Sequence, residues 1–226
     1  MYFLRWNIFL LLFAGPGLDS LCAQELDVFN PDYDGLNSGI IEKINNRRLA
    51  QQQQALEHSL SLQKTALYLT RDLRLTRFER MQNNRKVLER TAYLKSWKYG
   101  NSYTLMTVVI ATHYAVNFRG GRFYYDRKDT ETRSHLFYGD KPSKKEKEAP
   151  GYKADPVEDF SVNELADRIA GKFLRDKRAM KCLNAGYTVM GCSCTLEKNT
   201  VGRRRVPVIK ATFILGGKRL GLLEEA

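Results

Sequence analysis

Apolar residues recur at helical spacing through most of the first hundred positions. One stripe begins after Ser38 and consists of Ile40, Ile41, Ile44 and Leu49. A second stripe consists of Leu62, Ala66, Leu69 and Leu73. Apolar positions three and four residues apart predict amphipathic helices, and Asn37 or Ser38 is a suitable N-cap for the first. The glutamine run at 51–54 predicts a loop between them, and the charged stretch 78–97 continues the helical spacing.

After Gly100 the pattern changes to runs of β-branched and aromatic residues. Residues 103–118 and 122–126 flank a Gly-Gly pair, which predicts a hairpin. Residues 187–197 and 206–215 predict two further strands. Ser161 and Glu164 have the Ser-x-x-Glu spacing of a capping box, which predicts a helix start. The residues before this helix, 140–159, hold three of the six prolines and many charges, and predict a long solvated loop.

The order helices, hairpin, helix, hairpin indicates an α+β fold. The strands at 103–118 and 206–215 are apolar at nearly every position, so both faces of their sheet need cover. We therefore expect a three-layer α-β-α sandwich with a mixed, mostly antiparallel sheet. The capping-box helix is expected to cover one face with Leu165, Ile169 and Phe173. At least one of the two N-terminal helices is expected to cover the other face, through the stripes of Ile40, Ile44, Leu62, Ala66 and Leu69.

The N-terminus predicts a secretory signal peptide at 1–23. Arg5 precedes a short apolar run, helix breakers follow it, and Ala23 is a suitable residue before the cleavage point. An uncleaved anchor helix is the alternative, although the run is short for a membrane span. Lipid attachment at Cys22 is disfavoured by the bulky residue before it. The predicted chain is exported, as a secreted, periplasmic or envelope protein, and carries no membrane span after cleavage.

In this interpretation the mature chain has three parts. Residues 24–37 form an extended lead-in, 38–216 form a single domain that includes the charged loop 140–159, and 217–226 form a C-terminal tail. About two hundred residues suffice for one domain with a substantial core.

The formal charge of +12 favours an anionic partner. Outside the cytoplasm, the expected partners are acidic polymers of the cell envelope or another envelope protein. No alternation of basic and aromatic residues indicates nucleic acid. The alternative is that the charge only maintains solubility. The basic residues singled out as ligand-binding candidates are Arg203, Arg204, Arg205, Lys144 and Lys145.

Three cysteines lie within thirteen residues, at Cys182, Cys192 and Cys194. Their spacing does not match a zinc site, and no metal or other cofactor is predicted. Cys192 and Cys194 would point to the same face of a strand, too far apart to bridge comfortably. An oxidising compartment permits a disulfide from Cys182 to Cys192 or Cys194. The alternative is that all three are small buried hydrophobic residues.

Histidines supply the only candidates for catalysis. His58 lies on a polar stretch, whereas His113 lies within an apolar strand, and His135 lies in a segment that could cover the same sheet. No Gly-x-Ser-x-Gly, His-Glu-x-x-His or phosphate-loop motif is present. An acid/base role for His113 and His135 is therefore a hypothesis without a recognised motif.

Two regions resemble the CAP superfamily (cysteine-rich secretory, antigen 5 and pathogenesis-related-1 proteins), as a divergent member. "IIEKINNRR" and the apolar helix after it are similar to the family's opening, with Asn45 and Arg48 as its Asn-x-x-Arg pair. "YTVMG" stands where the family's "vGvg" strand begins, and "FILG" where its last strand ends. The resemblance covers residues 38–78 and 160–216 and implies an α-β-α sandwich, in agreement with the pattern above.

The resemblance does not extend to the cleft of the family. Many members carry two histidines and two glutamates there, sometimes with a divalent metal. No histidine follows the second helix, and the last strand has no "Gly-His-Tyr" signature, although "THY" at 112–114 is similar to it. The resemblance therefore implies an envelope domain that binds a ligand or anionic partner without catalysis. The alternative is an envelope hydrolase that acts on a cell-wall polymer or peptide through His113 and His135.

Overall fold

The computed structural model describes residues 31–72, 84–100, 103–126, 136–201 and 204–217. The predicted signal peptide at 1–23, residues 24–30 of the predicted lead-in and the tail beyond Gly217 lie outside these ranges. The helices are α1 Tyr33–Ala50, α2 Leu60–Leu67, α4 Arg85–Lys98, α5 Lys144–Lys147, α6 Val162–Arg175 and α7 Lys177–Asn184. A π-helical segment, Tyr68–Asp72, continues α2. The strands are β1 Glu57–His58, β2 Leu105–Tyr114, β3 Phe123–Tyr125, β4 Leu136–Tyr138, β5 Val189–Val201 and β6 Arg204–Gly217.

Four strands form the main sheet, in the order β1-β5-β6-β2. β1 runs parallel to β5, and the other neighbouring pairs are antiparallel, so the sheet is mixed and mostly antiparallel as expected. The predicted hairpin between 103–118 and 122–126 is wrong. β3 pairs with β4 in a separate two-stranded sheet, and Phe123 packs into a small core with Leu136 of β4 that also includes Val206 near the start of β6.

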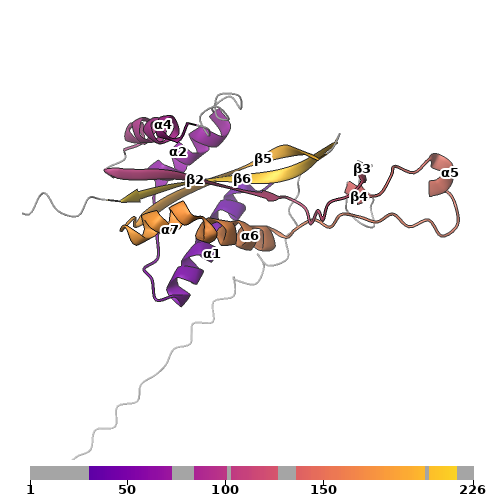
Figure 1. Cartoon of the computed structure of the whole chain (residues 1–226), viewed down its shortest axis with the longest axis horizontal. Helices are drawn as coiled ribbons and strands as arrows, with labels where there is room; N and C mark the ends of the chain where they lie inside the picture. The colour runs from indigo at the N-terminus through magenta and orange to yellow at the C-terminus, as the bar shows by residue number, and fades with distance from the viewer. Residues whose placement is uncertain (1–30, 73–83, 101–102, 127–135, 202–203, 218–226) are drawn as a thin grey trace, which may run out of the picture.

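Helices cover both faces of the main sheet, which confirms the three-layer sandwich (Figure 1). α2 and α4 lie on one face over a core that includes Leu62, Leu88 and Ile214. α1, α6 and α7 lie on the other face over a larger core that includes Ile169 and Phe213. Side chains alternate between the two faces along each strand, so nearly every position of β6 from 206 to 217 is buried.

The two N-terminal helices do not share a face, which corrects the predicted layers. Ile40 and Ile44 of α1 lie in the same core as Leu165 of α6. α1 and α6 pack directly against each other, with an Arg47–Asp167 ion pair at 2.8 Å on the outer side of their interface. Of the two predicted N-terminal stripes, only the second covers the opposite face as predicted, with Leu62 and Ala66 of α2 and Leu69 of the π-helical segment.

α1 begins earlier than the sequence pattern predicted. Asp32, and not Asn37 or Ser38, is the N-cap, and its side chain accepts a hydrogen bond from the backbone N–H of Gly35 at 2.9 Å. A carboxylate that satisfies a free amide of the first turn favours a helix start at that point. The extended lead-in is therefore wrong over residues 33–37.

Asn45 connects α1 to the segment that leads into β1. Its side-chain amide donates to the Leu56 carbonyl at 3.1 Å, and its side-chain oxygen accepts from the Leu56 N–H at 2.8 Å. Arg48 Nε donates to the Gln54 carbonyl at 2.9 Å. Both side chains of the Asn-x-x-Arg pair thus satisfy backbone groups of the loop that places β1 beside β5.

Replacing Asn45 with alanine is expected to cost about 1–2 kcal/mol of unfolding free energy, because both backbone groups of Leu56 lose their partner. Urea denaturation monitored by circular dichroism measures the change. Asn46→Ala is the matched control, since Asn46 is exposed on the same helix and alanine has the higher helix propensity. Equal stability of the two variants would contradict this role of Asn45.

The capping box at Ser161 and Glu164 is confirmed as the start of α6. Asp176 separates this helix from the next, since it is both the C-cap of α6 and the N-cap of α7. The Asp176 side chain accepts hydrogen bonds from the backbone N–H groups of Arg178 and Ala179, both at 2.9 Å. This break places α7 in contact with β2.

Candidate binding groove at the edge of β2

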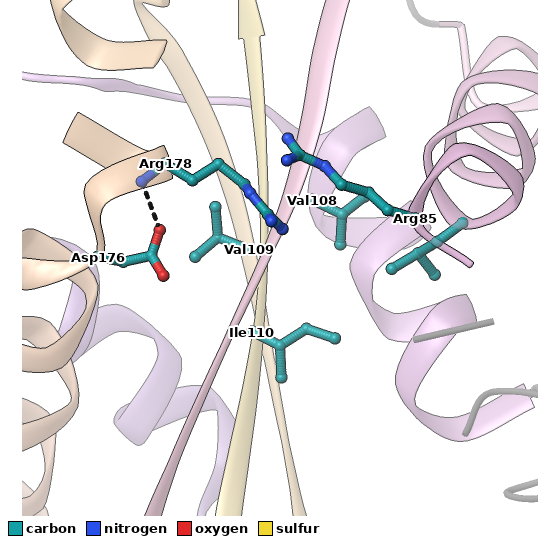
Figure 2. Close-up of a pocket in the computed structure, with 7 residues that line it drawn as sticks. Arg85, Val108, Val109, Ile110, Asp176 and Arg178 are labelled. Carbon is teal, nitrogen blue, oxygen red and sulfur yellow. Dashed lines mark hydrogen bonds between the residues drawn. The ribbon is translucent and has the colours of Figure 1, made fainter. Parts of the chain in front are cut away.

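β2 is an edge strand, and a groove runs along it between α4 and α7 (Figure 2). One hollow of about 210 Å³ is lined by Val108, Val109 and Ile110 of β2. A second hollow, of about 520 Å³, is lined mainly by residues of α7. The two hollows share Arg85 and Arg178 and so lie next to each other, and together they are called the groove.

The α4 wall is fixed by a hydrogen-bonded triad. Arg85 Nε contacts the Glu89 carboxylate at 2.8 Å, and its guanidinium also donates to Thr107 Oγ1 at 3.1 Å. The Thr107 hydroxyl donates to Glu89 at 2.7 Å. Because Thr107 lies on β2 and is buried, the triad attaches α4 to the edge strand and neutralises the charge of Arg85 locally.

The α7 wall carries the uncompensated charge of the groove. Lys177, Arg178 and Lys181 line it, and none of the three has an ion pair within the described part of the chain. The carboxylate of Asp176, the N-cap of α7, accepts hydrogen bonds from the backbone amides of Arg178 and Ala179. Arg178 extends over β2 toward Arg85 from the opposite side (Figure 2).

Cys182, Ala185 and Tyr187 provide the less polar lining of the groove. Burial raises the pKa of the Cys182 thiol above its ordinary value, although a hydrogen bond with Thr107 acts in the opposite direction. Burial also raises the pKa of Tyr187. A protonated thiol and a protonated phenol are poor nucleophiles at neutral pH. The arrangement is therefore suited to binding an anion and not to covalent catalysis.

His113 lies away from this groove, on the face covered by α6. Its Nδ1 donates to the Tyr114 carbonyl at 2.9 Å, and its ring packs edge-on against Phe160. Burial lowers the pKa of His113, and the cations Lys172 and Arg168 lower it further, while the carbonyl contact raises it. His135 lies outside the described residues, so a pairing of the two histidines stays a hypothesis. His58 lies exposed on β1.

The predicted basic cluster in the charged loop is balanced by acidic residues. Residues 140–159 contain five lysines and six carboxylates, for a formal charge of −1. Lys144 and Lys145 lie exposed on α5, and Lys144 is 3.9 Å from Glu148. The loop therefore does not form the strongly cationic surface that its lysines alone suggested.

The other predicted cluster is only partly described. Arg205 is exposed near the start of β6, and its carbonyl accepts from the hydroxyl of Tyr125. Arg203 lies outside the described residues, as does the side chain of Arg204. Arg205 is therefore the one member whose side chain is placed.

The predicted disulfide is not formed, since Cys182, Cys192 and Cys194 are all free thiols. Cys192 and Cys194 project into the core between the sheet and the α1–α6 layer, where burial raises the pKa of Cys192. The Cys182 thiol instead lies half-buried beside Thr107. The alternative, small buried hydrophobic residues, is confirmed for Cys192 and Cys194 only.

A second polar cluster lies on the α2 face of the sheet. Thr70 and Ser193 share a hydrogen bond at 3.2 Å, and Ser193 lies opposite Thr212 in the β5–β6 ladder. Further along, Lys210 contacts Glu197 at 2.9 Å. Thr70 pairs with Ser193 and Lys210 with Glu197, whereas the buried Thr212 hydroxyl has no hydrogen-bond partner among the described residues. None of these residues lines either hollow of the groove, so the cluster is better explained as part of the packing than as a binding site.

Searches of the described residues add two observations. They contain no group of three or more histidine, cysteine, aspartate or glutamate side chains placed to hold a metal ion. They also contain no helix with the length and apolar character needed to cross a membrane. No protein-family model matches the chain, and no curated protein sequence matches it.

Proposed function

We propose that this protein is an exported, CAP-like envelope domain that binds an anionic partner without catalysing a reaction, and that the groove between α4 and α7 is its binding site. The main support is the charge of the α7 wall. Its Lys177, Arg178 and Lys181 side chains lack ion pairs among the described residues and border a hollow with an apolar lining. Unpaired cations beside a concave surface attract and concentrate anions. The signal-peptide pattern at 1–23 supports an envelope location.

Two features support the CAP-like assignment. The side chains of the Asn-x-x-Arg pair, Asn45 and Arg48, hydrogen-bond to the backbone of the loop before β1. These bonds give both residues of the motif a role in holding the fold. Gly191, in the "vGvg" position, lies where α2 crosses β5. The α-β-α layers agree with the fold that the resemblance implies.

The hydrolase alternative has less support. A general base needs a neutral imidazole near substrate and a second group that orients it. Nδ1 of His113 is bound to a backbone carbonyl, and two cations, Lys172 and Arg168, are among the groups that act on its pKa. The lowered pKa keeps the His113 imidazole neutral and the carbonyl orients it, but in the described part of the chain no hydrogen bond joins its ring to an acid or a nucleophile, and His113 lies away from the groove. The cysteine of the groove, Cys182, has a raised pKa, which keeps its thiol protonated.

The test compares two charge reversals of equal size in the protein lacking residues 1–23. Arg178→Glu with Lys181→Glu alters the groove, and Lys144→Glu with Lys145→Glu alters the charged loop. Binding of poly-L-glutamate is measured by calorimetry at several salt concentrations. We expect the groove variant to bind at least about tenfold more weakly than the unmodified protein, a loss of about 1.4 kcal/mol or more in binding free energy. The loop variant should bind with nearly the affinity of the unmodified protein.

Salt provides an independent check, because interactions between exposed charges are screened over about 10 Å at 0.1 M ionic strength. Affinity of the unmodified protein should therefore fall steeply as salt rises. Equal losses in both variants would assign binding to overall charge and remove the groove as the site. Undetectable binding of the unmodified protein at low salt would contradict the proposed function itself.

A further inference from the structure

The backbone of β2 faces outward along the floor of the groove. The Ala115 N–H donates to the Pro207 carbonyl of β6 at 2.9 Å. In the register of β2 on β6, the odd-numbered residues of β2 therefore direct their backbone N–H and C=O groups toward β6. Backbone groups of alternate residues point to opposite edges in an antiparallel strand. Val108 and Ile110 therefore direct their N–H and C=O groups away from the sheet, where no described residue pairs with them.

The outward backbone carbonyls of β2 are hydrogen-bonded from Thr112 onward, whereas no described residue pairs with those of Val108 and Ile110. The Thr112 carbonyl accepts a hydrogen bond from Lys172 Nζ at 2.6 Å, and the Tyr114 carbonyl is bound by His113. Both groups point to the same edge as those of Val108 and Ile110. The protein thus engages the outward carbonyls beyond residue 111 with side chains but leaves the backbone groups of 108 and 110 without a partner among the described residues, beside a hollow, with Val108 itself 3% exposed in the unbound protein. Natural proteins usually protect exposed edges, so an open one indicates a partner.

We propose that the anionic partner is an extended acidic peptide that pairs with β2 as a fifth strand of the sheet. This inference rests on the proposed function, since it identifies the partner of the same groove. Strand addition uses the main-chain hydrogen bonds of an exposed edge for affinity and side-chain contacts for specificity. A polysaccharide has no regular row of amide groups to match Val108 and Ile110, whereas an extended peptide does.

The walls of the groove determine which peptide fits. Side chains of an added strand alternate between the two faces of the sheet. Those on the α7 face would meet Lys177, Arg178 and Lys181, which favour glutamate or aspartate. Those on the α4 face would meet Leu88 and Ile110, which favour apolar residues. The preferred sequence therefore alternates acidic and apolar residues.

Charge disfavours a second copy of the protein in the groove. Pairing of two β2 edges across a two-fold axis would bring the Arg178 wall of one copy toward that of the other. Like charges held opposite each other destabilise such a pairing. The same cations attract an acidic peptide, so charge complementarity selects the peptide over the dimer.

The experiment uses an end-blocked peptide that alternates glutamate and valine, together with the same peptide methylated on its backbone amides. Methylation keeps the carboxylates but removes the strand-pairing donors. We expect the unmethylated peptide to bind at least about tenfold more tightly. We also expect it to slow hydrogen exchange of the Val108 and Ile110 amides, measured residue by residue by NMR spectroscopy, by at least about tenfold.

Equal binding of both peptides without protection at Val108 and Ile110 would overturn strand addition while leaving the groove as an electrostatic site. Failure of both peptides and of poly-L-glutamate would overturn the proposed function as well. A protein dimer whose formation protects the two amides would assign the edge to a second copy. Protection in the free protein that disappears when residues 24–30 are deleted would assign it to the chain's own acidic segment. Either result would overturn the peptide proposal.

Discussion

Replacing Gly191 with alanine is expected to lower the free energy of unfolding by about 3 kcal/mol or more. A Cβ at this position would lie 2.2 Å from the backbone nitrogen of Gln63 and 2.3 Å from the carbonyl carbon of Leu62. Both atoms belong to the backbone of α2, which cannot move aside as a flexible side chain does. α2 must therefore shift away from β5, and overpacking of this kind costs 1–3 kcal/mol or more. Urea denaturation measures the loss.

Gly39→Ala is the matched control for this prediction. A Cβ there would lie 3.4 Å from the Ala166 side chain, an ordinary contact, within helix α1. Alanine is favoured over glycine in a helix by about 1 kcal/mol, so this variant should be as stable as the unmodified protein or more stable. A Gly191→Ala protein of unchanged stability would show that α2 does not pack on β5 as closely as described.

Replacing Ile169 with aspartate is expected to cost several kcal/mol and to leave little folded protein. Ile169 is fully buried in the core between α1, α6 and the sheet. An unpaired carboxylate in that core has no partner and must be desolvated, which places the substitution among the most destabilising classes. Thermal and urea unfolding of the purified variant measure the effect.

Ile169→Val separates loss of packing from burial of charge. It removes one methylene and should cost about 1 kcal/mol. Stability of the aspartate variant close to that of the valine variant would mean that position 169 is accessible to water. That result would contradict the placement of α6 on the sheet.

Local sequence signals predicted the parts of the fold that depend on nearby residues. Ser161 and Glu164 are three residues apart, and their capping box forms as predicted. The apolar runs at 103–118 and 206–215 predicted strands with cover on both faces, and β2 and β6 lie in such a sheet. These features depend on spacing within one element.

Features that depend on contacts between distant segments were not predicted correctly. An apolar stripe shows that α1 needs a partner but does not identify the face of the sheet, and Ile40 packs with α6 and not with α2. The run at 122–126 has strand character, yet its partner is β4. The sequence contains no information at short range that distinguishes these pairings.

The groove was missed for the same reason. Arg85 and Arg178 belong to different helices and come together only across β2. The local density of basic residues pointed instead to Lys144 and Lys145, where the acidic residues of the same loop outnumber the lysines. The break at Asp176 was the available signal, because an aspartate two residues before Arg178 is a suitable N-cap for a separate helix.

The segment that carries β3, β4 and α5 leaves and rejoins the sandwich at one point. Val116 forms a bridge with Asp159, and the Asn117 N–H donates to the Glu158 carbonyl at 2.9 Å. β3, β4 and α5 lie beyond the end of the main sheet (Figure 1). Because its two ends are neighbours, evolution could lengthen, shorten or exchange this segment without altering the register of β2 on β6. The position is likewise a natural place to graft a reporter domain, far from the groove at 108–110.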